Sequence, residues 1–325
     1  MKKALLNQLS QLKIIQKIFR GNASILMLHR IAPLENNRLS PNENMKVTPD
    51  FLEDFITTSL SEGYRFISLD TLYEGLIQGN LEKKSLVITI DDGYKDNFIF
   101  GYPIFKKYQI PFCIYVCTSF PQRSHNMWWF ALEDYLLESD MVTIAGEKID
   151  VKNVKDKEYA FLRLRDIIIA NSSSYEDANS IMNKLGIFYD PRHYDSLSMG
   201  WEEIKLLSQD PIATIGNHTH SHPIFNNLSP DQITQDIQTA NELFKSKINY
   251  TPKHFAYPFG SRIEVSSRHF ELIKNLNFKT ATTTRQGTIY PQHKKFLTAL
   301  PRIFFHENFR LENSFKIRKK IIITA

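Results

Sequence analysis

The chain has few cysteines, two in 325 residues. Cys113 and Cys117 lie in one apolar run that is typical of a strand. On a strand they share one face, but they are too far apart along it to bond to each other. The sequence therefore excludes a disulfide between them and predicts two reduced core cysteines, as in cytoplasmic proteins.

Long hydrophobic runs are also absent. No apolar stretch reaches the length of about 20 residues that a membrane crossing needs. Lys2 and Lys3 begin the chain, but Asn7 and Gln8 interrupt the apolar run behind them, so we expect no signal peptide. The prediction is a cytoplasmic protein. Residues 1–22 favour an amphipathic helix, which either packs on the rest of the protein or lies on a membrane surface.

A large excess of one charge is missing too. The formal net charge is +5, and the basic residues are spread along the chain apart from a short block at 316–320. That block suits a solvated tail or a contact with anionic lipid. No pattern combines basic with stacking aromatic residues, so we expect no nucleic-acid partner.

Short apolar runs alternate with amphipathic segments along most of the chain. Thr48 and Pro49 mark one helix start, with threonine as the N-cap and proline at the first helical position. Strand–helix alternation predicts a parallel sheet, and seven or eight such units predict a closed barrel. We therefore expect one domain over 1–325, a distorted TIM-like (β/α)7–8 barrel with its site at the carboxyl ends of the strands. The expected strands are 24–29, 64–68, 85–90, 112–117, 212–215, 253–256, 279–283 and 301–305, and the main expected helices are 49–62, 95–107, 201–209, 229–247 and 266–275.

Residues 118–200 interrupt this alternation. We expect a mainly helical insertion there, placed at the active-site face because it follows a barrel strand. It contains Trp128 and Trp129. Adjacent tryptophans either stack on sugar rings or form the insertion's own core.

Two polar clusters stand directly after apolar runs. Thr89-Ile90-Asp91-Asp92-Gly93 follows one, and His218-Thr219-His220-Ser221-His222 follows another. One carboxylate and two histidines make a three-ligand set for a catalytic metal with an open position, and the second carboxylate is available as a base. His220 points away from its neighbours in an extended segment, so we leave it out of the ligand set. The first hypothesis is metal-assisted hydrolysis.

With these clusters the sequence resembles the polysaccharide deacetylase family, also known as NodB-homology enzymes or carbohydrate esterase family 4. The family motif T-F-D-D-G corresponds to residues 89–93, and H-[ST]-x-x-H corresponds to 218–222. The third motif, R-x-P-[YF]-G, corresponds to residues 256–260, with Ala256 in place of the arginine. The resemblance runs from about residue 24 to about residue 305, with a break near 120–198.

The resemblance implies a role for each motif residue. Asp92, His218 and His222 would hold a divalent metal, with Zn²⁺ as the first choice and Co²⁺, Mn²⁺ or Ni²⁺ as alternatives. Asp91 would be the general base, and the backbone N–H of Phe259 would donate to the oxyanion.

Two departures from the family pattern affect the remaining roles. In the family, the arginine that is absent here orients the base. Arg302 either replaces it from another strand end or forms a surface ion pair. We expect His29 to be the general acid. The segment 24–29 resembles the circularly permuted branch of the family, in which the last strand is moved to the front. His306 is the alternative. Tyr257, Pro258, Arg302, Trp128 and Trp129 complete the expected substrate-binding set.

The implied activity is removal of an N-acetyl group from an amino sugar in a cell-surface polysaccharide, a glycolipid or a precursor of these. The expected partner is accordingly an N-acetylated sugar, oligosaccharide or glycolipid. Two other hypotheses stay open: a related amidase or esterase acting on another acyl group, and a non-catalytic carbohydrate-binding relative.

Overall fold

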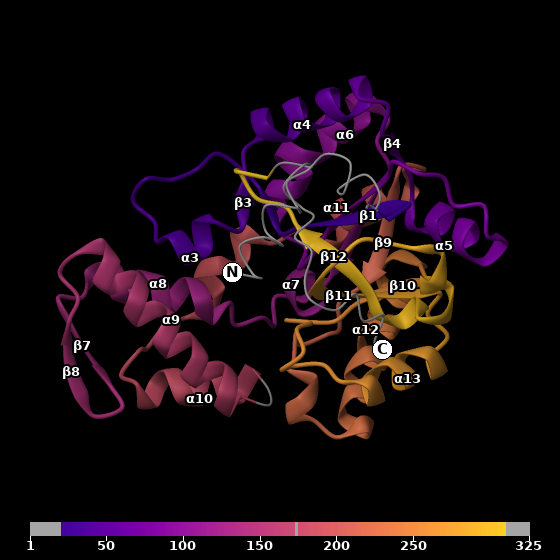
Figure 1. Ribbon diagram of the computed structural model, residues 1–325. Coiled ribbons are helices and arrows are strands. Elements are labelled where there is room, and N and C mark those ends of the chain that lie inside the picture. Colours follow the sequence, from indigo (N-terminus) through magenta and orange to yellow (C-terminus); the bar gives the residue numbers. More distant parts are fainter. Residues whose placement is uncertain (1–20, 173–174, 310–325) are drawn as a thin grey trace, which may run out of the picture.

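The computed structural model describes residues 21–172 and 175–309, and its centre is a closed barrel of seven parallel strands (Figure 1). The strands follow one another around the barrel in chain order, and β1 closes it by pairing with β12 on one side and β5 on the other. The barrel strands are β1 (Ala23–Leu28), β5 (Ser85–Ile90), β6 (Phe112–Val116), β9 (Ala213–Asn217), β10 (His254–Ala256), β11 (Thr280–Gln286) and β12 (Leu300–Phe304). The predicted TIM-like barrel is confirmed, with seven strands.

The expected strand at 64–68 does not enter the ring. It is reduced to β4 (Arg65–Phe66), which pairs with Ser85 and Leu86 at the start of β5. β6 pairs only with residues 88–90 of β5, so the first part of that edge is left for β4. β4 therefore extends the sheet outside the closed barrel.

Amphipathic helices surround the strands, as the alternation predicted. The Thr48 hydroxyl accepts a hydrogen bond from the Phe51 N–H, which confirms the predicted N-cap. The expected helix at 95–107 differs in detail, because it begins with a π-helical turn over Asn97–Gly101. The outer helices are α4 (Pro49–Ser61), α5 (Leu69–Gln78), α6 (Tyr102–Tyr108), α11 (Trp201–Gln209), α12 (Pro230–Ile248) and α13 (Ser267–Asn275).

Alternate residues of the strands face the two sides of the barrel wall. On β5, Ile88 and Ile90 pack in the cluster that includes helix residues such as Phe105, whereas Val87 shares the inner cluster with Tyr115. A Cβ atom at Gly216 would lie 2.2 Å from the Tyr115 ring, so glycine is required there for the ring to fill the barrel. The same alternation turns Thr89 and then Asp91 toward the interior.

The segment between β6 and β9 forms a unit with a core of its own. It contains α7 (Ser119–Gln122), α8 (Trp128–Glu138), the hairpin β7 (Met141–Ile144) and β8 (Glu147–Asp150), α9 (Val154–Asn171) and α10 (Tyr175–Lys184). Leu132, Phe161 and Leu164 are buried in its core. In Figure 1, α8, α9, α10 and the hairpin gather to one side of the barrel. The insertion limits 118–200 and the single-domain division stay predictions.

A smaller unit follows β1. It consists of β2 (Arg30–Ile31), α3 (Ser40–Glu43) and β3 (Lys46–Val47), with β2 and β3 paired in parallel. Helix α3 lies near α9 (Figure 1). This part of the chain therefore lies beside the unit between β6 and β9.

The cysteine and membrane expectations can be compared with these residues. Cys113 and Cys117 are buried and form no disulfide in the described chain, as predicted. None of the helices within 21–172 and 175–309 combines the length and apolar character that a membrane crossing requires. The predicted amphipathic helix over 1–22 falls almost wholly outside the described residues, and the basic block at 316–320 lies outside them.

Candidate active site

The acidic pair lies where β5 ends and the chain turns sharply. Asp91 and Asp92 are almost wholly buried. Asp92 and Gly93 both have left-handed backbone, with φ values of 76° and 102°. Such a φ is uncommon for a residue with a side chain and marks a position where the surrounding structure fixes the backbone. The two carboxylates thereby leave the turn in different directions.

Two histidines meet Asp92 from the loop after β9. The Nε2 atoms of His218 and His222 lie 3.3 Å and 3.4 Å from Asp92 Oδ1. The ligand atoms of these three residues all lie within 4.8 Å of one another. Asp92 Oδ1 is buried without a hydrogen bond of normal geometry in the described chain. The sequence-predicted ligand set is therefore brought together around one point.

The chemistry of this set fits a divalent metal. His218 Nδ1 lies 2.8 Å from the Ala256 carbonyl oxygen and can only donate to it, so in the neutral imidazole the lone pair of Nε2 points at the shared position. Burial raises the pKa of Asp92, but its contacts with His218 and His222 outweigh burial and hold it well below its ordinary value. Two imidazoles and one ionised carboxylate leave a fourth position open, as in catalytic zinc sites.

Asp91 is held by Arg302 across the barrel. Arg302 Nη1 and Nη2 lie 2.6 Å and 2.7 Å from the two Asp91 carboxylate oxygens, and the arginine is fully buried. Its Nε donates to the Thr283 carbonyl, and Nη1 also donates to the Thr89 hydroxyl. Burial raises the pKa of Asp91, but the Arg302 guanidinium together with His218 and His29 outweighs burial, so the pKa lies below its ordinary value. Arg302 thus forms a buried bidentate pair and not a surface ion pair.

His29 follows β1 and lines the same cavity as the acidic pair. Its Nδ1 is buried and has no hydrogen-bond partner in the described chain. Burial lowers its pKa most strongly, and Asp92 and Asp91 oppose this only in part. His306 instead stacks on Phe304, with ring centroids 5.7 Å apart, and does not line the cavity.

This main cavity has a volume of about 540 Å³ and an aromatic wall. Trp128, Trp129 and Phe259 line it, and Trp128 also packs in the core of its own unit. Tyr257 and Pro258 are buried and do not line it; the Tyr257 hydroxyl donates to the Thr298 carbonyl instead. Arg302 does not line it either, because it lies beneath Asp91.

Phe259 lies in the turn after β10 with a φ of 58°. The Thr284 hydroxyl donates to its carbonyl oxygen at 2.6 Å and fixes the turn. Its backbone N–H has no acceptor in the described chain. An N–H held in this way can donate to a ligand at no cost in reorganisation.

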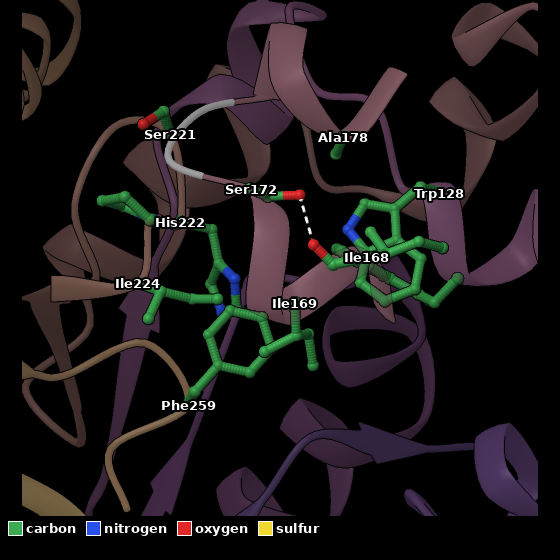
Figure 2. Close-up of a pocket in the computed structure, with 11 residues that line it drawn as sticks. Trp128, Ile168, Ile169, Ser172, Ala178, Ser221, His222, Ile224 and Phe259 are labelled. Atoms are coloured by element: carbon green, nitrogen blue, oxygen red, sulfur yellow. Dashed lines mark hydrogen bonds between the residues drawn. The ribbon is translucent and has the colours of Figure 1, made fainter. Parts of the chain in front are cut away.

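A side recess of about 30 Å³ adjoins the main cavity. Figure 2 shows His222 and Phe259 along one part of its wall and Trp128 and Ile168 along another, with Ile169 between them. The rings of His222 and Phe259 lie 4.9 Å apart. The recess is mostly apolar and has room for only one or two water-sized groups.

Sequence reasoning missed the residue that holds the histidine loop. Asp236 of α12 accepts hydrogen bonds from the backbone N–H groups of His220 and Ser221, at 2.7 Å and 3.2 Å, and from the Ser221 hydroxyl. The His220 ring contacts the Thr118 hydroxyl at 3.0 Å, outside the ligand set. No local pattern could have found Asp236, because it lies in the next helix among other polar residues.

Comparisons with known proteins identify a family and a fold. A family model for polysaccharide deacetylase matches residues 78–281. A search of curated proteins found no match.

Three solved structures illustrate the likeness of fold. The Streptococcus pyogenes deacetylase PplD in complex with acetate is 20% identical, with 89% of this chain and 94% of that chain covered and a TM-score of 0.60. IcaB from Ammonifex degensii is 16% identical, with 88% and 93% covered and a TM-score of 0.57. A de-N-acetylase from Aggregatibacter actinomycetemcomitans is 13% identical, with 89% and 96% covered and a TM-score of 0.57. At these identities the likeness shows the fold alone.

Proposed function

Since this chain belongs to the polysaccharide deacetylase family, we propose that it is a metal-dependent hydrolase that removes N-acetyl groups from amino sugars. Its substrate is a cell-surface polysaccharide, a glycolipid or a precursor of either. The observation that carries the proposal is the meeting of Asp92, His218 and His222 beside an Asp91 that Arg302 keeps ionised.

Asp92, His218 and His222 are the proposed ligands of a divalent cation, with Zn²⁺ as the first choice and Co²⁺, Mn²⁺ or Ni²⁺ as alternatives. The bound cation would polarise the acetyl carbonyl and lower the pKa of a water molecule in the site. The Ala256 carbonyl orients His218, and Asp236 holds the loop on which both histidines lie. These contacts keep the ligand atoms in place before any cation arrives.

Asp91 is the proposed general base. Its lowered pKa keeps it ionised at neutral pH, and each carboxylate oxygen retains a lone pair after accepting from Arg302. It takes a proton from the attacking water as that water adds to the acetyl carbon. The Phe259 N–H then donates to the oxygen that becomes negative, and only its backbone is needed for this.

His29 is the proposed general acid. The leaving nitrogen must be protonated, because an amide anion is a very poor leaving group. Burial keeps His29 neutral in the resting site, with its lowered pKa. Negative charge that develops on the substrate raises this pKa, so His29 can take up the proton that Asp91 has removed and pass it to the nitrogen.

The side recess supports acetyl as the acyl group. Its volume of about 30 Å³ suits a methyl group better than a longer chain. The carbohydrate-binding alternative rested on the missing arginine of the third motif. The contact of Arg302 with Asp91 removes that reason for it.

Acetate release from a panel of N-acetylhexosamine mono- and oligosaccharides tests the proposal. The zinc-loaded protein should release acetate from at least one of them, and propionyl analogues of that substrate should react more slowly. His29→Gln should abolish most of the activity, whereas the matched variant His306→Gln should retain it. Equal loss in the two variants, or no acetate from any N-acetylated sugar, would contradict the proposal.

A further inference from the structure

The main cavity contains an arginine to which the proposed reaction gives no role. Arg30 directly follows His29, and its Nε donates to Asp96 Oδ2 at 2.6 Å. Its guanidinium carbon lies 5.2 Å from the centre of the Tyr94 ring and 5.4 Å from that of Phe130. One carboxylate and two aromatic rings therefore hold the guanidinium in one orientation.

Among residues 21–172 and 175–309, no side chain or backbone group accepts a hydrogen bond from the two terminal nitrogens of Arg30. Neither nitrogen is among the fully buried unpaired atoms of the described chain, and the side chain to which they belong lines the cavity. The side chain is only 12% exposed, so water is restricted around it. A guanidinium with one edge fixed and its terminal N–H groups unused matches the paired oxygens of a carboxylate or phosphate.

A second arginine lines the same cavity from α9. Within the part of the chain that the structure describes, Arg165 pairs only with its neighbour Asp166, at 3.1 Å on the surface, which is a weak interaction. The acidic residues among the described lining are Asp91, which Arg302 neutralises, and Asp92, which lies between the histidines. Apart from Asp92 and the Asp91–Arg302 pair, the acidic and basic side chains that line the cavity are Arg165 and Arg30, which pairs with Asp96 through its Nε.

We infer that the main cavity binds an N-acetylated saccharide that also carries an oxyanion, a carboxylate or a phosphate, on Arg30 and Arg165. The inference rests on the proposed function, since it identifies the class of substrate for the same site. The cavity volume of about 540 Å³ lies within the range of about 300–1,000 Å³ typical of ligand sites, so it has room for more than an acetamido group. The protein would then bind the acetamido group and the oxyanion of such a substrate at the same time.

Calorimetric binding to the zinc-loaded protein tests the inference with three ligands: the methyl glycoside of N-acetylglucosamine, N-acetylglucosamine 1-phosphate and a disaccharide of N-acetylglucosamine with a uronic acid. We expect at least one anionic ligand to bind about 10-fold more tightly than the neutral glycoside, the size of a charge-assisted hydrogen-bond pair. The phosphate and uronate arms distinguish the two sources of oxyanion. No preference for either anion would overturn the inference.

Variants separate binding at the arginines from binding at the metal. Arg30→Lys keeps the charge beside Asp96 but loses the fork, and Arg165→Gln lies near the surface, where it is tolerated. Each should reduce the preference for the anion several-fold. Arg163→Gln is the matched control, because Arg163 is on the same helix but does not line the cavity. An anion that only coordinated zinc would bind the Arg30 and Arg165 variants as tightly as the wild type, which would refute the inference.

Acetate release distinguishes this inference from the proposed function. Release from the neutral and anionic ligands with equal kcat/KM, and with equal affinity, would refute the inference and leave the deacetylase proposal standing. An arginine-dependent preference in binding, with no acetate from any ligand, would support the oxyanion site and refute the deacetylase proposal.

Discussion

Replacing Arg302 by methionine should destabilise the metal-free protein strongly. The change removes two hydrogen bonds to Asp91 at 2.6 Å and 2.7 Å, and it leaves a buried carboxylate without its counter-charge. Removing one partner of a buried pair costs about 3–5 kcal/mol. The free energy of unfolding, measured by urea denaturation followed by circular dichroism, should fall by this amount.

A double-mutant cycle shows how much of this cost belongs to the pair. In Asp91→Asn/Arg302→Met neither charge remains, so the double variant should be more stable than the sum of the single effects by about 2–3 kcal/mol. Arg285→Met is the matched control, because Arg285 is half-buried and has no carboxylate partner in the described chain. Equal costs for Arg302→Met and Arg285→Met, or a cycle without coupling, would refute the reasoning.

The Asp91–Arg302 pair also determines how the free energy of unfolding changes with pH. Burial raises the pKa of Asp91 and Arg302 lowers it below the ordinary value, so the wild type gains stability above the unfolded-state pKa of about 3.9. That gain is lost as the pH falls through the lower pKa of the folded state. In Arg302→Met the contribution of Arg302 is lost, and burial, which raises the pKa of Asp91, is opposed only by the nearby histidines His218 and His29. The difference in unfolding free energy between wild type and variant should therefore be largest near neutral pH and narrow in acid.

Three further outcomes are expected. Asp236→Asn should weaken zinc binding about 10- to 100-fold in a competition titration, because the loop with both histidines loses one of its two acceptor oxygens and the negative charge. Asp236→Glu should restore part of the affinity, and unchanged affinity in the asparagine variant would refute this role. Ile169→Ala should enlarge the side recess and raise kcat/KM for propionyl relative to acetyl substrates, and an unchanged ratio would show that the acyl group lies elsewhere. Chelation should abolish acetate release and added Zn²⁺ should restore it, whereas activity that persists after complete metal removal would contradict a metal-dependent reaction.

Much of the barrel follows from local patterns. Residues 85–90 form a mostly apolar run, and the structure has β5 over the same residues. The helix predicted at 201–209 also has these bounds. The strand expected at 64–68 shortened to Arg65–Phe66 because the neighbours of β5 leave little edge free, which only the closed barrel determines. The π-helical turn at 97–101 likewise has no sequence signal that we recognised.

The site residues likewise divide into those that a sequence motif predicts and those that only the fold reveals. Asp92, His218 and His222 could be found because each lies in a short motif after an apolar run. The sequence left open whether Arg302 is the partner of Asp91, since Arg302 is 211 residues away and on a strand that does not pair with β5. Arg30 has no motif at all, and only the cavity reveals its unused nitrogens.

The most direct test of the central claim is to measure bound metal and released acetate together in the wild type and in Asp91→Asn. The account predicts that both proteins bind one equivalent of Zn²⁺ through Asp92, His218 and His222, and that only the wild type releases acetate from an N-acetylated sugar. A wild type that binds none of Zn²⁺, Co²⁺, Mn²⁺ and Ni²⁺, or an Asp91→Asn variant as active as the wild type, would contradict it.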